Sequence, residues 1–334
     1  MSTDTQAPTG TTYPLDPRVG TQEVTSEPIR MGFGRGLLEA GRRDERVLAL
    51  CADLTDSTQM SLFKKEFPDR FVEVGIAEQN LATVASGMAR AGRIPFTSSY
   101  AAFSPGRCWE QIKTTACLNE LPVMTVGSHA GLITGPDGAT HQMLEDIAIM
   151  RVMPGMTVIC PGDSVEAEKA TIAMAAHGSA CYLRLARDKT PVFSTPESPF
   201  EIGKAYVLRE GADVTLVGTG TMTYELLVAA GLLAKDGIDA EVVHVPTVKP
   251  LDAETILASA RKTGVVVTAE EAQIKGGLGG AVCELLAEEA PMPVKRLGVD
   301  DRYGETGGPR ELLEAFELTA EHLSRKIAAF VRRA

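Results

Sequence analysis

The stretch M-G-F-G-R-G-L-L-E-A-G (31–41), followed by V-L-A-L-C-A (47–52), decides the fold class of this chain. The first segment has the apolar pattern of a helix, and the second is a short apolar run typical of a strand buried on both faces. Runs of the second kind recur at 123–126 and 157–160. Helical patterns that alternate with such runs predict an α/β fold, with a mainly parallel sheet flanked by helices.

A proline-rich stretch divides the chain. Residues 191–199 (P-V-F-S-T-P-E-S-P) contain three prolines in nine residues, which excludes a continuous helix or a central strand and predicts a linker. We therefore place a first domain at 27–195 and a second at 196–334. Residues 1–26 are rich in Thr, Pro, Ser and Asp without hydrophobic period, and we expect a disordered or extended tail.

The second domain repeats the α/β pattern on a smaller scale. Apolar runs typical of strands lie at 214–218, 240–245 and 264–269, and a helical pattern covers about 224–235. The sequence therefore predicts two domains, each with a mainly parallel sheet flanked by helices.

Composition excludes several classes of protein. With 44% hydrophobic and 23% charged residues the 334-residue chain is typical of a globular protein, and a net charge of -11 argues against a nucleic-acid partner. No window approaches the roughly 18 apolar residues of a membrane span, and no leader pattern opens the chain, so we expect a cytoplasmic protein. The six cysteines include no C-x-x-C pair, which argues against a zinc or redox motif.

The segment V-G-I-A-E-Q-N-L-A-T-V-A-S-G-M-A (74–89) predicts a turn followed by a helix rich in small residues, a candidate subunit interface. Glu78 stands at its start. One interpretation is an acid favoured by the helix dipole, and the other is a carboxyl group that stays protonated in an apolar interface and donates a hydrogen bond.

Two later segments carry further candidates. Tyr100 and Phe103 are three residues apart and could form a platform for a flat ring, although core packing is the commoner reason for such a pair. Residues 128–142 contain His129, Asp137, His141 and three glycines, which suit proton transfer and hydroxyl contacts near closely approached backbone. The spacing of these three side chains matches no zinc pattern, so we predict no metal ligands in this chain.

Two glycine-rich stretches invite a nucleotide interpretation. G-T-G-T-M-T (218–223) has threonine where the dinucleotide fingerprint requires its third glycine, and K-G-G-L-G-G (275–280) lacks the ending of a phosphate loop. We interpret both as tight turns with close helix packing.

Taken in order, these segments resemble the pyrimidine-binding and C-terminal domains of the transketolase family, from about residue 28 to the C-terminus. The activating glutamate of that family lies in a G-[I/V]-x-E segment, which is 75–78 here, and its D-G-x-T-H-Q segment is 137–142. The resemblance implies a thiamine-diphosphate enzyme in which Tyr100 and Phe103 stack on the pyrimidine and Glu78 hydrogen-bonds it.

The same resemblance assigns the remaining site residues. Asp53 would lie near the cofactor, and His141 would assist proton transfer besides binding substrate. The implied substrate ligands are Arg30, Ser57, His129 and Arg187 for the phosphate, with Asp137 and His141 for the sugar hydroxyls. An arginine fork, a hydroxyl and an imidazole suit a terminal phosphate.

Departures from the family pattern imply a partner. Full-length members hold the cofactor diphosphate and Mg²⁺ or Ca²⁺ through a G-D-G motif, which this sequence lacks, and the chain begins with a short tail where they have a further domain. The resemblance therefore implies the C-terminal subunit of a split transketolase, in an α₂β₂ assembly with an N-terminal subunit. Gly106 stands where many members have a third aromatic, and Ala272 where many have histidine.

Alternatives within and outside thiamine enzymes stay open. They are the β subunit of a 2-oxo acid dehydrogenase, a deoxyxylulose-phosphate-synthase-like enzyme, and a non-catalytic regulatory subunit. Deoxyxylulose-phosphate synthases typically have an arginine soon after the stacking aromatic, whereas Ser104 and Pro105 follow Phe103 here. Sugar phosphates are the expected substrates, either in the pentose phosphate pathway or as branched or sulfonated sugars.

Overall fold

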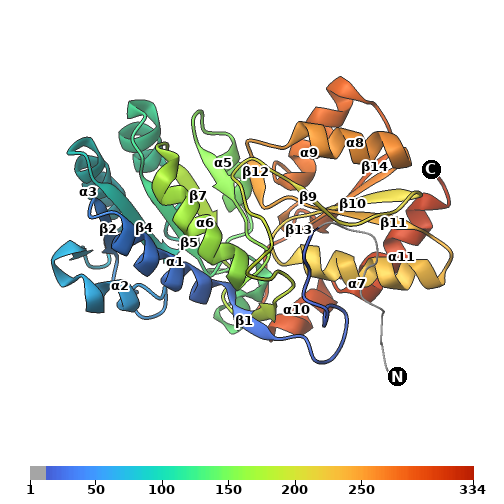
Figure 1. Ribbon diagram of the computed structural model, residues 1–334, viewed down its shortest axis with the longest axis horizontal. Helices are drawn as coiled ribbons and strands as arrows, with labels where there is room; N and C mark the ends of the chain where they lie inside the picture. The colour runs from blue at the N-terminus through green and yellow to red at the C-terminus, as the bar shows by residue number, and fades with distance from the viewer. Residues whose placement is uncertain (1–12) are drawn as a thin grey trace.

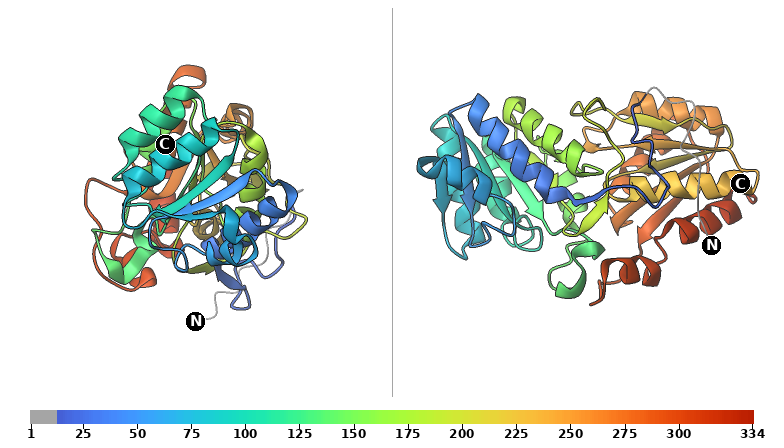
Figure 2. Two further views of the ribbon diagram at one scale, coloured as in Figure 1. Left: turned by 90° about the vertical axis from the view of Figure 1, so that its left-hand side faces the viewer. Right: turned by 60° about the horizontal axis from the view of Figure 1, so that its bottom comes forward.

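A computed structural model describes residues 13–334, which form two α/β domains lying end to end (Figure 1). Each domain has its own sheet, and helices cover both faces of each sheet, as the further views in Figure 2 also show. The predicted fold class, two mainly parallel sheets flanked by helices, is confirmed.

The first sheet has seven strands in the order β12-β6-β7-β5-β4-β2-β3. Its strands are β2 (Val47–Cys51), β3 (Phe71–Glu73), β4 (Ile94–Tyr100), β5 (Met124–Ser128), β6 (Thr157–Ile159), β7 (Cys181–Arg184) and β12 (Thr247–Lys249). All neighbours are parallel except the edge pair β12 and β6. Strand β12 comes from beyond the proline-rich linker, so the second half of the chain completes the sheet of the first.

Helices α1 (Ile29–Arg43) and α6 (Ser164–His177) pack together on one face of this sheet, and α3 (Glu78–Arg90) packs on the other. Glycines let α1 approach α6 closely: a Cβ added at Gly32 would lie 1.8 Å from the carbonyl oxygen of Ser164. Shorter helices are α2 (Ser61–Glu66), α4 (Trp109–Gln111) and α5 (Asp146–Arg151). Between residues 13 and 334, no helix is both long and apolar enough to cross a lipid bilayer.

The second sheet has five strands in the order β14-β13-β10-β11-β9, with only β9 antiparallel to its neighbour. The strands are β9 (Tyr206–Arg209), β10 (Val214–Gly218), β11 (Ala240–His244), β13 (Val266–Gln273) and β14 (Val294–Val299). The helices are α7 (Met222–Lys235), α8 (Ala253–Thr263), α9 (Leu278–Glu289), α10 (Pro309–Ala315) and α11 (Ala320–Val331).

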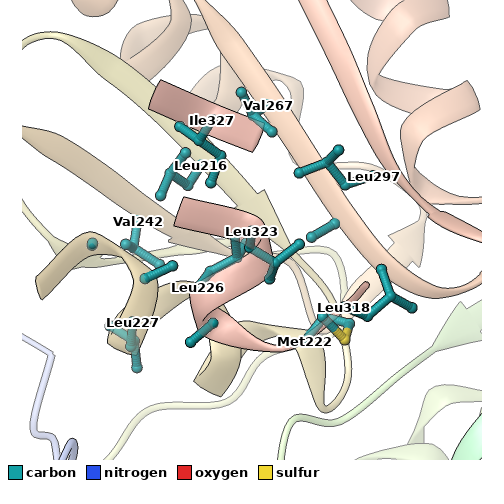
Figure 3. Packing of buried hydrophobic residues seen from close by; sticks show 14 of the residues in the cluster. Leu216, Met222, Leu226, Leu227, Val242, Val267, Leu297, Leu318, Leu323 and Ile327 are labelled. Carbon is teal, nitrogen blue, oxygen red and sulfur yellow. The ribbon is translucent and has the colours of Figure 1, made fainter. Parts of the chain in front are cut away.

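Successive residues of the central strand β10 point to opposite faces of the sheet and pack into the hydrophobic core on each side. Leu216 packs with Leu226 of α7 and Leu323 of α11 on one side, as Figure 3 shows. Val217 belongs to the cluster beneath α8 and α9 on the other side. Burial on both faces is the reason that this strand is a continuous apolar run.

The two glycine-rich stretches of the second domain are sites of close packing. A Cβ at Gly218 would lie 3.1 Å from the Cα of Thr223, and a Cβ at Gly277 would lie 1.9 Å from a carboxylate oxygen of Glu270. A side chain at position 277 would therefore displace Glu270, and one at position 218 would push the following helix away by a few tenths of an ångström.

The first part of the proline-rich linker, residues 192–194, is buried, whereas Pro196, Glu197 and Pro199 are exposed. Phe193 is fully buried, and the carboxylate of Asp163 accepts hydrogen bonds from the backbone N–H groups of Phe193 and Ser194. Of the predicted N-terminal tail, residues 1–12 lie outside the described part of the chain. Tyr13 packs against Tyr206 with ring centroids 5.3 Å apart, so the start of the described chain lies against the second domain.

A buried ion pair stands where the two domains meet. Arg184, at the end of β7, donates to the carboxylate of Asp146 on α5, and their side chains are 4% and 0% exposed. Tyr182 donates to the same carboxylate at 2.7 Å, and Arg184 also donates to the backbone oxygen of Glu271 on β13. Because Arg184 belongs to the first sheet and its guanidinium bonds to a strand of the second, it joins the two domains directly.

The contact between α1 and α6 gives a stability test. We expect Gly32→Ala to lower the free energy of unfolding by about 1–3 kcal/mol, because the helices must separate to accommodate the methyl group. Gly87→Ala on α3 is the matched control, since nothing lies within 4 Å of a Cβ there and alanine favours a helix. Urea unfolding followed by circular dichroism measures both, and equal stability of the two variants would contradict the packing described.

Candidate active site

Glu78 is the first residue of α3 and follows a turn in which Gly75 has a φ of 72°. The turn places the carboxylate inward, 3% exposed, at the N-terminal end of the helix. Arg107 Nη1 donates to Glu78 Oε2 at 2.8 Å, so the structure gives this carboxylate a charged partner. In the chain by itself the Glu78 carboxyl group thus faces an arginine, and the hypothesis that it donates a hydrogen bond in a subunit interface stays a prediction.

Two aromatic rings follow β4. Tyr100 ends the strand and Phe103 lies in the next turn, with ring centroids 6.1 Å apart and planes only 19° apart. Both side chains are partly exposed rather than part of the core. The carboxyl ends of parallel strands form the usual ligand crevice of an open α/β sheet, so the pair lies where a flat ligand ring can stack.

Both histidines of the 128–142 segment contact these rings. His129 stacks on Tyr100 with centroids 3.8 Å apart, and His141 meets Phe103 edge-on at 5.3 Å. Burial, together with the nearby positive charges of Arg30 and Arg187, lowers the pKa of His129 to about 3. The imidazole is therefore neutral at physiological pH, with Nδ1 hydrogen-bonded to the hydroxyl of Ser128 at 2.8 Å.

Two arginines lie together beside His129. Arg30 Nη1 donates to the backbone oxygen of Arg187, and Arg187 Nη1 lies 3.7 Å from a carboxylate oxygen of Asp137. Desolvation and the charge of Arg187 lower the pKa of Arg30. Adjacent guanidinium groups make a site suited to a phosphate or sulfonate.

The structure does not gather the candidate metal ligands. Asp137 lies against Arg187, and His141 Nδ1 shares a hydrogen bond with the hydroxyl of Thr140. Among the residues from 13 to 334, no three His, Cys, Asp or Glu side chains stand close enough to hold a metal ion.

Asp53 and Ser57 follow β2, the strand next to β4, at the same edge of the sheet. The contacts of Asp53 lead to Glu73 rather than to the rings: its backbone N–H donates to Glu73 Oε1 at 2.7 Å. Ser57 is half-buried in the turn that precedes α2. The structure thus places both after the carboxyl end of the strand next to β4.

Sequence reasoning missed three residues that shape the site: Arg107, Glu73 and Gln142. Glu73 accepts hydrogen bonds from the N–H groups of Asp53 and Gly75, and so joins the turn after β2 to the turn before Glu78. The Gln142 amide donates to Gly135 O and to Glu305 O of the second domain. No local pattern in the sequence indicates the long-range bonds, because Asp53 lies 20 residues from Glu73 and Glu305 lies 163 residues from Gln142.

Gly106 and Ala272, which differ from the family pattern, lie in different parts of the fold. A Cβ at Gly106 would lie 2.3 Å from the backbone oxygen of Ala102, so the tight turn leaves no room for a third aromatic. Ala272 is buried on β13, with 1% of its surface exposed.

Comparison with known proteins identifies the family. Residues 27–192 match the pyrimidine-binding domain of transketolase, and residues 203–323 match the transketolase C-terminal domain. The chain is 45% identical over 289 residues to the 6-deoxy-6-sulfo-D-fructose transketolase subunit SqwH of Clostridium sp. (strain MSTE9), covering 86% of this chain and 90% of that protein. The chain belongs to the transketolase family.

Two further relatives are named as a section or a split-gene form of transketolase. A putative transketolase C-terminal section of Methanocaldococcus jannaschii is 41% identical, with 90% of this chain and 95% of that protein covered. A solved split-gene transketolase, described as an inactive β4 tetramer, superposes with a TM-score of 0.86 at 43% identity, over 91% of this chain and 98% of that one.

The neutral state of His129 in this transketolase subunit predicts a pH dependence. Its folded pKa lies below the ordinary value of 6.5, so between about pH 6.5 and pH 3 the unfolded chain binds a proton that the folded chain does not. We expect this residue to cost about 1.4 kcal/mol of stability for each pH unit lowered through that window.

Acid unfolding of wild type and His129→Gln measures the effect as a difference in slope. Nuclear magnetic resonance of the imidazole provides the direct check, and a titration midpoint near pH 6 for His129 would contradict the assignment.

The bonds of Gln142 predict a loop that depends on the second domain. In Gln142→Ala the carbonyl groups of Gly135 and Glu305 lose their donor, and we expect amide hydrogen exchange across 131–138 to rise at least about tenfold. Gln79→Ala, at an exposed position of α3, is the control. Unchanged exchange in Gln142→Ala would show that the loop is held by other contacts.

Proposed function

We propose that this chain is the C-terminal subunit of a thiamine-diphosphate-dependent split transketolase, active together with an N-terminal subunit in an α₂β₂ assembly. It transfers a two-carbon ketol unit from a ketose phosphate to an aldose acceptor. The observation that carries the proposal is one continuous site in which a buried glutamate, two near-parallel aromatic rings, two histidines and an arginine pair follow one another.

The residues present fit the ring half of the cofactor. Tyr100 and Phe103 offer aromatic faces for stacking. The buried carboxylate of Glu78 is linked to them by Arg107, which donates a hydrogen bond to Glu78 and lies over the ring of Phe103. When bound, thiamine diphosphate supplies the carbon nucleophile and electron sink for cleaving a bond beside a carbonyl. No G-D-G motif stands in the sequence, so we assign the diphosphate and Mg²⁺ or Ca²⁺ to the partner subunit.

Each group of side chains in this chain has a different role in the proposed site. Glu78 would hydrogen-bond the aminopyrimidine nitrogen and so hold the ring against Tyr100 and Phe103. His129 and His141 contact the two rings, and an imidazole at this place can accept or donate protons at sugar hydroxyls. Arg30 and Arg187 bind the terminal oxyanion together with Ser57, and Asp137 accepts from a hydroxyl.

The name of one relative points to a second class of donor, a sulfonated ketose. SqwH, which is 45% identical, is named for 6-deoxy-6-sulfo-D-fructose, whose sulfonate is a tetrahedral oxyanion like a phosphate. Paired guanidinium groups bind either group, so a sulfonated ketose is the second candidate donor.

The residues directly after Phe103 differ from those of deoxyxylulose-phosphate synthases, but an arginine does lie near its ring. Arg107 follows Phe103 by four residues, and its guanidinium carbon lies 4.8 Å from the centre of that ring. The chain is also 37% identical to such a synthase from Symbiobacterium thermophilum, over 48% of that protein. Pyruvate with glyceraldehyde 3-phosphate therefore belongs among the substrates tested.

The test combines the chain with the N-terminal transketolase chain of its source, thiamine diphosphate and Mg²⁺. Transfer from xylulose 5-phosphate to ribose 5-phosphate, detected as sedoheptulose 7-phosphate, supports the proposal, and transfer only from 6-deoxy-6-sulfofructose supports the second donor. A cofactor-loaded complex that transfers from neither donor would contradict transketolase activity. The remaining alternatives would then be an enzyme that acts on 2-oxo acids or a subunit with a regulatory role.

Removal of the glutamate tests its role in the same assay. We expect Glu78→Ala to lower kcat at least about a hundredfold, because the aminopyrimidine loses its hydrogen-bond partner. Glu45→Gln, an exposed acid outside the site, serves as control. Near wild-type turnover in Glu78→Ala would remove Glu78 from the mechanism.

A further inference from the structure

Arg107 connects the two features of the site that face the cofactor ring. Its guanidinium donates to Glu78 Oε2 at 2.8 Å, and its Cζ lies 4.8 Å from the centroid of Phe103. The Arg107 guanidinium therefore contacts both groups that the aminopyrimidine would use: the Glu78 carboxylate, to which the ring would hydrogen-bond, and the Phe103 ring, on which it would stack.

The turn after Phe103 produces this placement. Since a Cβ at Gly106 would meet the backbone oxygen of Ala102 at 2.3 Å, the chain doubles back tightly and carries no side chain at that position. The next residue is Arg107, and its guanidinium lies over the ring of Phe103. A cation thus stands over one of the two rings on which the pyrimidine would stack.

The two members of the ion pair differ in freedom to move. The Glu78 side chain is 4% exposed and is held at the start of a helix, whereas the Arg107 side chain is 52% exposed. A long, half-exposed side chain can swing into solvent at little cost, and a partly exposed ion pair is weak enough to be broken by a ligand.

We infer that Arg107 is a displaceable cap on Glu78, which compensates the buried carboxylate while the cofactor is absent and leaves when the aminopyrimidine takes its place. The inference rests on the proposed function, since it assigns Glu78 to the cofactor ring. Arg107 is thus a positioning residue that sets the affinity for thiamine diphosphate through Glu78. Its removal makes cofactor binding tighter.

The experiment is isothermal titration of thiamine diphosphate, with Mg²⁺, into the complex of this chain with its N-terminal subunit. For Arg107→Gln we expect the Kd to fall about threefold to tenfold, since no ion pair has to be broken. Arg107→Lys keeps the charge and should stay within about twofold of wild type, and Arg107→Met is a second uncharged variant should glutamine disturb folding. Arg325→Gln, on an exposed face of α11, is the matched control.

A double-mutant cycle shows whether the effect acts through Glu78. In a Glu78→Gln background, Arg107→Gln should change the Kd by less than about twofold, because the partner charge is already gone. Unchanged or weaker binding in Arg107→Gln, or an equal gain in both backgrounds, overturns the inference and leaves the proposed function standing. Failure of the wild-type complex to bind thiamine diphosphate overturns both.

Discussion

The guanidinium of Arg184, buried between the domains, is the constraint on which the rest of the structure depends. It bonds to Asp146 beneath the first sheet and to the backbone of Glu271 in the second. Loss of either charge would leave the other buried and uncompensated, which proteins tolerate poorly. The relative position of the two sheets is therefore set by a contact with little freedom to adjust.

The same contact reaches the active site through Glu271. One of its carboxylate oxygens accepts from the backbone N–H of Ile133 at 2.6 Å, and the other accepts from Thr221 at 3.1 Å. A Cβ at Gly131 would lie 2.5 Å from Glu271 Oε1, so the loop that carries His129 and Asp137 rests directly on the domain junction. The second domain supports a site to which it gives none of the proposed ligands.

Regular features of the fold were predictable from the sequence, and long-range ones were not. The helix at 31–41 and the strand at 47–52 follow from apolar spacing, and the structure has them as α1 and β2. The candidate site residues were found because their motifs occur in a familiar order. Arg107 was overlooked because its importance comes from two partners, one of them 29 residues away in α3. Strand β12 has only three residues between two prolines, too short for any periodicity.

Strand β12 also has a consequence for how the chain can be made and divided. It covers the β6 edge of the first sheet, yet it is synthesised after the linker and three strands of the second domain. Until it emerges from the ribosome, the nascent first domain presents an open strand edge, a surface prone to pairing with other chains. A gene cut at the linker would leave that edge permanently uncovered, so the boundary drawn in the sequence is not a line along which the molecule comes apart.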